Sequence, residues 1–260
     1  MKKLLLLLAI VLLGNTTIAQ EKTYLLFEFM KVDNEQEAAY AETEAFWEKI
    51  HAQRVKNGDI VGWDLWSLQP GGESQGFQYM TVNVYNDPVK MFTNAGDFDA
   101  ALKAAYPDMS EEEVNKAINK SGKTRDLAVR LYLEIVKKTS GDFNMEIGTL
   151  AAIGFMKVTG GSAVYEKAEL ETFLPMHQEQ VDAGAKGSWQ VIRVMSPIGS
   201  DTYTSHLTVN MYTGYDQYFK SNEAMWGEEP SEADAKKMEE GIATRDLKMV
   251  SLATLIKKVR

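Results

Sequence analysis

The sequence predicts an α+β protein in which two consecutive ferredoxin-like modules, each of order β-α-β-β-α-β, pack their antiparallel sheets together as one intrachain barrel. Two observations predict this fold. The second part of the chain repeats the first, and each copy contains four strand patterns and two helical regions in that order. A four-stranded sheet with helices on one face needs cover on its other face, which a second sheet in the same chain provides.

The repeat is visible as matches that keep the same order along the chain. Phe29-Met30-Lys31-Val32 returns as Phe155-Met156-Lys157-Val158, an offset of 126. The same offset pairs Thr23 with Thr149, Trp47 with Phe173, His51 with His177, Val55 with Val181, Gly58 with Gly184 and Trp63 with Trp189. Later matches join 81–85 to 208–212 and 124–127 to 244–247. The offset changes where loops tolerate changes in length, so we infer a duplication.

Periodicity places the elements of each copy. In the first copy, apolar or alternating runs predict strands at Thr23–Val32, Ile60–Leu68, Phe77–Tyr85 and Leu127–Val136. A helix is expected at Glu35–Lys56, Pro70-Gly71-Gly72 marks a turn, and the capping pattern at 110–113 begins the last part of a second helical region. In the second copy we expect strands at Thr149–Val158, Ser188–Ser196, Thr202–Tyr212 and Leu247–Ile256, a helix at Val164–Ala183, and further helices up to Ala243, with Ser231 and Asp234 as a cap.

The N-terminus has the pattern of a secretory signal peptide. Lys2 and Lys3 precede an apolar run from Leu4 to Leu13, and Thr17 and Ala19 fit a small-x-small cleavage site. Ten apolar residues are too few for a membrane span, which needs about twenty. The predicted organisation is therefore a signal peptide at 1–19, a first module at 20–138, a linker at 139–148 and a second module at 149–260. We expect an exported protein, periplasmic or extracellular.

Composition excludes several classes of function. The chain has no cysteine, which excludes disulfides, thiolate nucleophiles and cysteine-based metal sites. Removal of Lys2 and Lys3 leaves 26 basic and 37 acidic residues, a net charge of −11. Such a surface repels nucleic acid and anionic membranes, so neither is an expected partner of the mature protein.

The end of the first helix carries a spaced motif in both copies, His-x6-Gly-x4-Trp. It comprises His51, Gly58 and Trp63, and then His177, Gly184 and Trp189. With the element order and the duplication, this motif resembles the dimeric α+β barrel superfamily, which includes antibiotic-biosynthesis-type monooxygenases, heme-degrading monooxygenases, NIPSNAP-like proteins and EthD-like proteins. The resemblance covers the whole mature chain and implies a fold much more strongly than an activity. It also allows heme as a cofactor.

His51 and His177 are the candidate catalytic residues. Each borders the apolar side of its helix, where a half-buried imidazole could act as a general base, ligate heme or line a pocket. The alternative is a structural histidine that hydrogen-bonds a backbone carbonyl near the helix end.

The third strand of each copy presents a polar and aromatic face. At period two, this face consists of Tyr79, Thr81, Asn83 and Tyr85 in the first copy, and of His206, Thr208, Asn210 and Tyr212 in the second. Such groups need partners when buried, so we take Tyr79, Asn83, His206 and Asn210 as candidate ligand-binding residues. The alternative is a polar seam between the two sheets. If only one half is active, His206 favours the second.

Two further pairs complete the candidates. Trp63 and Trp189 begin a strand and could wall a pocket, although aromatic residues at a barrel end are usually core. Arg125 and Arg245 could clamp a carboxylate of a ligand. Their alternative role is a helix-end cap with a local ion pair to Asp126 and Asp246.

The motifs searched for and not found limit the possible chemistry. The chain contains no glycine-rich phosphate loop, no His-Glu-x-x-His, no Gly-x-Ser-x-Gly and no acidic calcium loop, and we expect no metal site.

Three hypotheses about function remain. The first is an exported protein that binds a small apolar or aromatic molecule. The second is a cofactor-free or heme-dependent monooxygenase or isomerase that uses the first-helix histidine. The third is a structural or interaction module. The intrachain pseudo-dimer leaves room for a further homodimer.

Overall fold

The computed structural model describes residues 22–69, 74, 76–225 and 231–260. The predicted signal peptide, its cleavage site before Gln20, and the turn at Pro70-Gly71-Gly72 lie outside the described residues. None of the helices in these ranges is long and apolar enough to cross a membrane.

Each half of the chain has strands and helices in the predicted order. The first half contains β1 (Tyr24–Lys31), α2 (Glu37–Lys56), β2 (Gly62–Gln69), β3 (Tyr79–Tyr85), α3 (Pro88–Thr93), α4 (Phe98–Ala105), α5 (Glu111–Thr124) and β4 (Asp126–Lys138). The second half contains β5 (Leu150–Val158), α6 (Ser162–Ala168), a π-helical turn η2 (Glu169–Phe173), α7 (Leu174–Asp182), β6 (Ser188–Ser196), β7 (His206–Tyr212), α8 (Tyr215–Met225), α9 (Glu232–Ile242) and β8 (Arg245–Val259).

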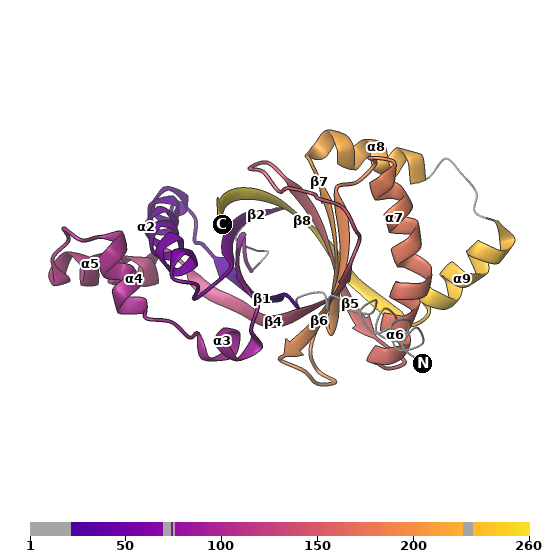
Figure 1. The fold of residues 1–260 in the computed structure, drawn as a ribbon, viewed down its shortest axis with the longest axis horizontal. Helices are drawn as coiled ribbons and strands as arrows, with labels where there is room; N and C mark the ends of the chain where they lie inside the picture. Colours follow the sequence, from indigo (N-terminus) through magenta and orange to yellow (C-terminus); the bar gives the residue numbers. More distant parts are fainter. Residues whose placement is uncertain (1–21, 70–73, 75, 226–230) are drawn as a thin grey trace, which may run out of the picture.

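The eight strands form one closed antiparallel barrel in the order β1-β3-β2-β8-β5-β7-β6-β4. Two ladders join the halves: β2 pairs with β8, and β4 pairs with β6. The helices of the two halves lie on opposite sides of the barrel, α2 to α5 on one side and α6 to α9 on the other (Figure 1). The predicted fold class, an α+β intrachain barrel, is confirmed.

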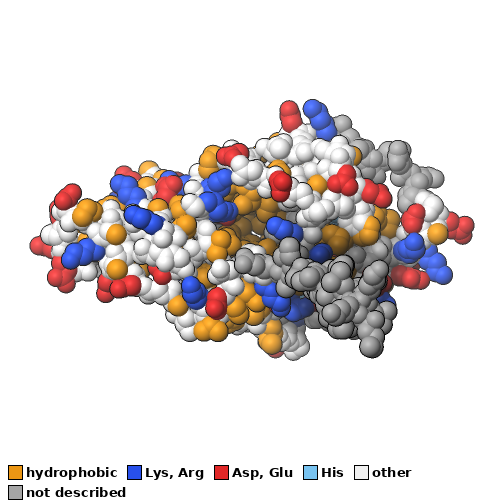
Figure 2. Space-filling model, in the orientation of Figure 1, with side chains coloured by type: hydrophobic (Ala, Val, Ile, Leu, Met, Phe, Trp, Pro, Cys, Tyr) orange, Lys and Arg blue, Asp and Glu red, His pale blue; other side chains and the backbone are white. Residues whose placement is uncertain are grey.

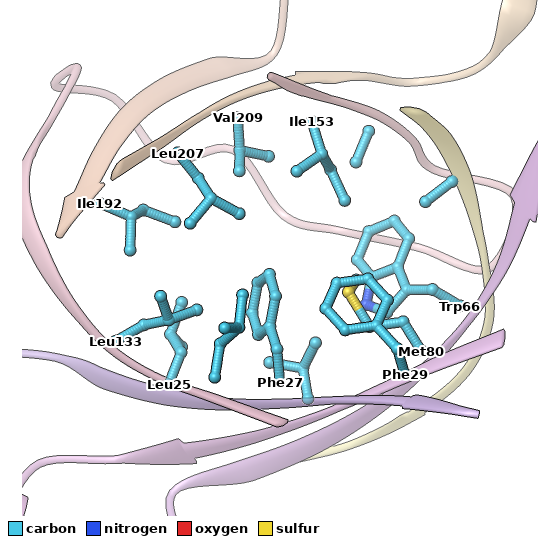
Figure 3. Close-up of a cluster of buried hydrophobic side chains, with 14 of the residues drawn as sticks. Leu25, Phe27, Phe29, Trp66, Met80, Leu133, Ile153, Ile192, Leu207 and Val209 are labelled. Carbon is cyan, nitrogen blue, oxygen red and sulfur yellow. The ribbon is translucent and has the colours of Figure 1, made fainter. Parts of the chain in front are cut away.

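The barrel interior is apolar because every strand turns alternate residues inward. One cluster takes residues from all eight strands, among them Phe27 and Phe29 of β1, Leu133 of β4 and Ile153 of β5 (Figure 3). Burying such a side chain contributes roughly 1.5–3 kcal/mol. Met80 and Val82 of β3 belong to this cluster. The polar face of β3 therefore faces the helices, and the alternative of a polar seam between the two sheets was wrong.

The capping signals read from the sequence are present. Ser110 and Glu113 form a capping box at the start of α5, and the Ser231 hydroxyl accepts a hydrogen bond from the Asp234 backbone at the start of α9. The predicted strand from Thr202 begins only at His206. Residue 60 was expected at the start of a strand, but it lies in the loop before β2.

Charged and hydrophobic side chains are distributed differently over the surface. On the face shown in Figure 2, charged side chains of both signs are scattered over the two helical ends, and hydrophobic side chains gather toward the middle, over the barrel.

Candidate functional site

A cavity of about 290 Å³ lies in the first half, between α2 and the outward face of the sheet. Strands β1 to β4 form one wall, with Trp63 as the contribution of β2, and α2 with the segment 91–98 forms the other. Its lining consists of Leu26, Glu28, Glu44, Trp47, His51, Arg54, Trp63, Thr81, Asn83, Met91, Phe92, Asn94, Phe98, Arg125, Arg130 and Tyr132. Four residues predicted from the sequence therefore meet here: His51, Trp63, Asn83 and Arg125.

His51 is held in this cavity by stacking. Its imidazole lies nearly parallel to the indole of Trp63, with ring centroids 5.0 Å apart and an interplanar angle of 12°. The side chain is 9% exposed. Burial, together with the charges of Arg54 and Arg125, lowers the pKa of His51 to about 3, so the ring is neutral at physiological pH. Its Nδ1 atom has no hydrogen-bond partner among the described residues.

Asn83 lies beside the same tryptophan, because Trp63 of β2 and Asn83 of β3 are cross-strand partners. The amide is 4% exposed, and its Oδ1 atom also has no partner in the part of the chain that the structure describes. Buried polar atoms in folded proteins are almost always hydrogen-bonded. Among the polar side chains that line the cavity, His51 Nδ1, Asn83 Oδ1 and Glu44 Oε2 thus lack a partner in the described residues, and a bound molecule could satisfy them.

Arg125 pairs with a residue that the sequence reasoning missed. Its guanidinium donates to Glu44 of α2, not to the neighbouring Asp126. Glu44 is fully enclosed, and burial raises its pKa to about 7 although Arg125 acts in the opposite direction. A second ion pair, Arg130 to Glu28, lines the same cavity through two hydrogen bonds of 2.9 and 2.6 Å.

The second half contains the same arrangement, but its glutamate aligns with that of the first half at an offset one residue smaller than that of the histidines. Arg245 donates to the buried Glu169 at 2.6 Å, and Tyr165 lies beside this pair as Tyr40 does in the first half. Tyr40 and Glu44 correspond to Tyr165 and Glu169 at an offset of 125, and the extra residue is taken up by the π-helical turn Glu169–Phe173. The sequence therefore did contain a signal for this pair, because Glu44 and Glu169 match at an offset of 125. An alignment of the two copies at a constant offset of 126 does not show this match. The anion-clamp hypothesis for Arg245 is weakened because a buried carboxylate already occupies it.

His177 Nδ1 and Asn210 Oδ1 both have hydrogen-bond partners. His177 stacks on Trp189 with centroids 4.7 Å apart. Lys186 Nζ lies 2.9 Å from His177 Nδ1 and donates to Asn210 Oδ1 at 2.6 Å. Burial lowers the pKa of His177 to about 3 and that of Lys186 to about 7. The same polar atoms that lack partners in the first half are thus bonded to a lysine in the second.

His206 and Tyr79 lie outside the cavity. His206 Nε2 is 3.0 Å from Glu166 Oε1, and Arg193 donates twice to the same carboxylate. Tyr79 packs against Tyr40, with ring centroids 4.5 Å apart. Because His206 is enclosed in a satisfied network, the structure does not support our preference for the second half, and the candidate site moves to the first.

The residues that line this cavity do not fit heme. Small-molecule pockets span roughly 300–1,000 Å³, and this cavity, at about 290 Å³, lies at the lower limit. Its walls carry two Glu–Arg pairs rather than the flat apolar slot that a porphyrin requires. Within the described ranges, no group of three or more His, Asp or Glu residues could hold a metal ion.

Comparison with known proteins shows the fold. No protein-family model matches the chain, and no curated protein matches its sequence. Among solved structures, it is similar to a candidate monooxygenase from Fusobacterium nucleatum subsp. nucleatum (TM-score 0.54, 10% identity, 93% of this chain and 95% of that one). It is also similar to an anthrone oxidase-like protein (0.54, 12%, 92% and 93%) and to a candidate monooxygenase from Lactobacillus acidophilus (0.50, 9%, 92% and 96%). The chain has the dimeric α+β barrel fold. At these identities the likeness extends to the fold alone.

Proposed function

We propose that this chain is an exported small-molecule-binding protein whose site is the cavity beneath α2 in the first half. One observation carries the proposal: His51 Nδ1 and Asn83 Oδ1 are buried beside a cavity and lack hydrogen-bond partners among the described residues. An unsatisfied buried polar group costs about 1–3 kcal/mol. A ligand that bonds to both atoms recovers this cost, and the aromatic walls of Trp47, Phe92 and Phe98 supply apolar contact.

The export part of the proposal rests on the sequence of residues 1–19. The measurement is the intact mass of the protein recovered from outside the cytoplasm of a bacterial host. A mature N-terminus at Gln20 is expected. Full-length protein retained in the cytoplasm would contradict export without affecting the binding proposal.

Catalysis is the second candidate, and Glu44 is the observation in its favour. A carboxyl group with a pKa of about 7 that lines a cavity is matched to proton transfer at neutral pH. His51, with a pKa of about 3, is a weak base under these conditions. The monooxygenase and oxidase names of the similar structures suggest oxygenase chemistry on an aromatic substrate, with Glu44 in place of His51 as the proton acceptor.

Isothermal titration of the purified protein with 2-naphthol tests the binding proposal. This probe has a flat apolar body and one hydroxyl group. We expect saturable binding with one site per chain, weakened about tenfold by Asn83→Leu. Tyr79→Phe is the matched control, because Tyr79 lies on the same face of β3 but outside the cavity. Equal affinity in Asn83→Leu and the wild type would place the binding elsewhere.

A further inference from the structure

The two halves differ at one position, and the residue there determines whether the buried histidine and asparagine of that half have a hydrogen-bond partner. Ile60 in the first half corresponds to Lys186 in the second. The backbone around both is the same: the preceding glycines, Gly58 and Gly184, have φ angles of 75° and 72°. The amides of Asp59 and Ala185 bond to the carbonyls of Arg54 and Gln180, each 2.9 Å away, and the residue after each position bonds to the third strand of its half.

In the second half, the amine of Lys186 occupies the position between the buried histidine and asparagine. Its side chain is 2% exposed, and its amine lies 2.6 Å from Asn210 Oδ1 and 2.9 Å from His177 Nδ1. A lysine amine has only donors when protonated, so both atoms act as acceptors toward it. The amine therefore shows what group fits between a histidine Nδ1 and an asparagine Oδ1 on this scaffold.

In the first half, Ile60 belongs to an apolar cluster and offers no donor. His51 and Asn83 hold the equivalent places, with the same stacking on the strand-two tryptophan and the same cross-strand register to it. We propose that the Lys186 amine marks where the first half takes the hydrogen-bond donor of its ligand. This donor is a neutral hydroxyl group whose single proton goes to Asn83 Oδ1 and whose oxygen accepts from the Nδ1–H tautomer of His51. This inference rests on the proposed function and specifies its ligand.

Charge selects a neutral hydroxyl over an amine. Arg54 lines the first-half cavity, where it donates to the neutral amide of Asn94 at 2.8 Å. Its counterpart in the second half is the uncharged Gln180, which lies 3.4 Å from His177. Besides the ion-paired Arg125 and Arg245, each half thus carries one further cation near its histidine, Arg54 in the first and Lys186 in the second. A ligand ammonium would add a second cation beside Arg54, which Coulomb repulsion disfavours.

The residues that line the cavity around this donor position indicate the shape of the rest of the ligand. Phe92 stacks on Tyr132 with centroids 4.5 Å apart, and Trp47 packs against Phe98 at 5.8 Å. All four residues line the cavity. Aromatic walls favour a flat ring. The ligand class is therefore an uncharged hydroxyl on an aromatic body.

The test exchanges the deciding residues between the halves. Isothermal titration compares 2-naphthol, 2-methoxynaphthalene and 1-naphthylmethylamine, which present a hydroxyl donor, no donor and a cation. Wild type should bind 2-naphthol about tenfold more tightly than either of the others, a difference of about 1.4 kcal/mol, which is within the range for one net hydrogen bond. Arg54→Gln with Ile60→Lys, which copies the second half, should abolish 2-naphthol binding. Lys186→Ile with Gln180→Arg, which makes the reverse exchange, leaves the first-half cavity unchanged and should bind 2-naphthol as the wild type does.

The outcomes separate the two proposals. If wild type binds 2-naphthol and 2-methoxynaphthalene equally, or the Arg54→Gln/Ile60→Lys variant binds like the wild type, the donor position is wrong while the binding function stands. If no probe binds the wild type, both proposals fail. The circular dichroism spectrum and melting temperature of each variant establish that it is folded before any loss of binding is scored.

Discussion

Arg125, the residue between α5 and β4, reaches back to the buried carboxylate of Glu44 in the middle of α2. Arg245 makes the same connection to Glu169 in the second half. Each pair joins the last strand of a half to its first helix, and neither arginine uses the aspartate that follows it in the sequence. Since the arginine is the charge that compensates a carboxylate 1% exposed, the pair fixes the helix over the sheet.

Removing one partner of this pair should be costly. Arg125→Met leaves Glu44 buried without its counter-charge, and we expect a loss of about 3–5 kcal/mol in the free energy of unfolding. Urea denaturation followed by circular dichroism measures it. The double variant Arg125→Met/Glu44→Leu should lose much less, because no buried charge is left. A double variant as unstable as Arg125→Met would mean that packing, not charge compensation, explains the loss.

The buried histidines should make the protein sensitive to acid. The pKa of His51 falls from 6.5 to about 3 on folding, so the unfolded chain binds more protons than the folded chain between these values. Its contribution to stability is complete above pH 6.5 and falls by about 1.4 kcal/mol per pH unit as the pH drops toward 3. His51→Gln should remove this slope. Denaturation curves at pH 7, 6 and 5 for both proteins would contradict the assignment if their difference did not change with pH.

The sequence was sufficient for the fold because the signals were local and repeated. Alternation in β1 and β3 separated the inward face of Phe27 and Val82 from the outward face of Asn83. Closure of the barrel followed from the need to cover each apolar sheet. Element ends were less predictable: the segment before His206 was assigned to a strand, although its residues form the loop that contains Pro197.

The site was only partly predictable, because it depends on contacts between distant segments. His51, Trp63 and Asn83 were found from spacing within one helix and two strands. Glu44 was missed because no local pattern shows that a helix residue will meet Arg125, 81 positions later. The choice between halves could not be made from His206. It depends on residues 60 and 186. The sequence analysis put residue 60 at the start of a strand and residue 186 between a predicted helix and strand, and neither was a candidate site residue.

Substitutions of two leucines of β4, one in the barrel interior and one exposed, should differ in their effect on stability. Leu133 is 0% exposed and lies in the interior cluster, whereas Leu127 is 45% exposed. Leu133→Ala should cost about 2–5 kcal/mol, since it removes apolar contact and leaves a cavity. Leu127→Ala should change stability by less than about 0.5 kcal/mol. Similar losses in urea denaturation would contradict the placement of the β4 register.

Hemin should not bind at the candidate site. Because the cavity is too small and carries paired charges, any change in the Soret band of added hemin should be the same in the wild type and in His51→Ala. The matched controls are His51→Ala and His177→Ala. A Soret shift in the wild type that His51→Ala alone abolishes would restore the heme hypothesis for the first half.

Lys186 should give the second half a pH dependence that the first half lacks. Burial lowers its pKa from 10.5 to about 7, so the unfolded chain binds the proton more tightly than the folded chain. This contribution to stability is complete above pH 10.5 and is lost as the pH falls toward 7. Lys186→Met keeps the length of the side chain and removes the titration, so the stability difference between variant and wild type should change between pH 9 and pH 7. Ile60→Met, at the equivalent position, is the control and should show a difference independent of pH. A constant difference for Lys186→Met as well would mean that its amine keeps an ordinary pKa, and that the bonds to His177 and Asn210 offset the cost of its burial.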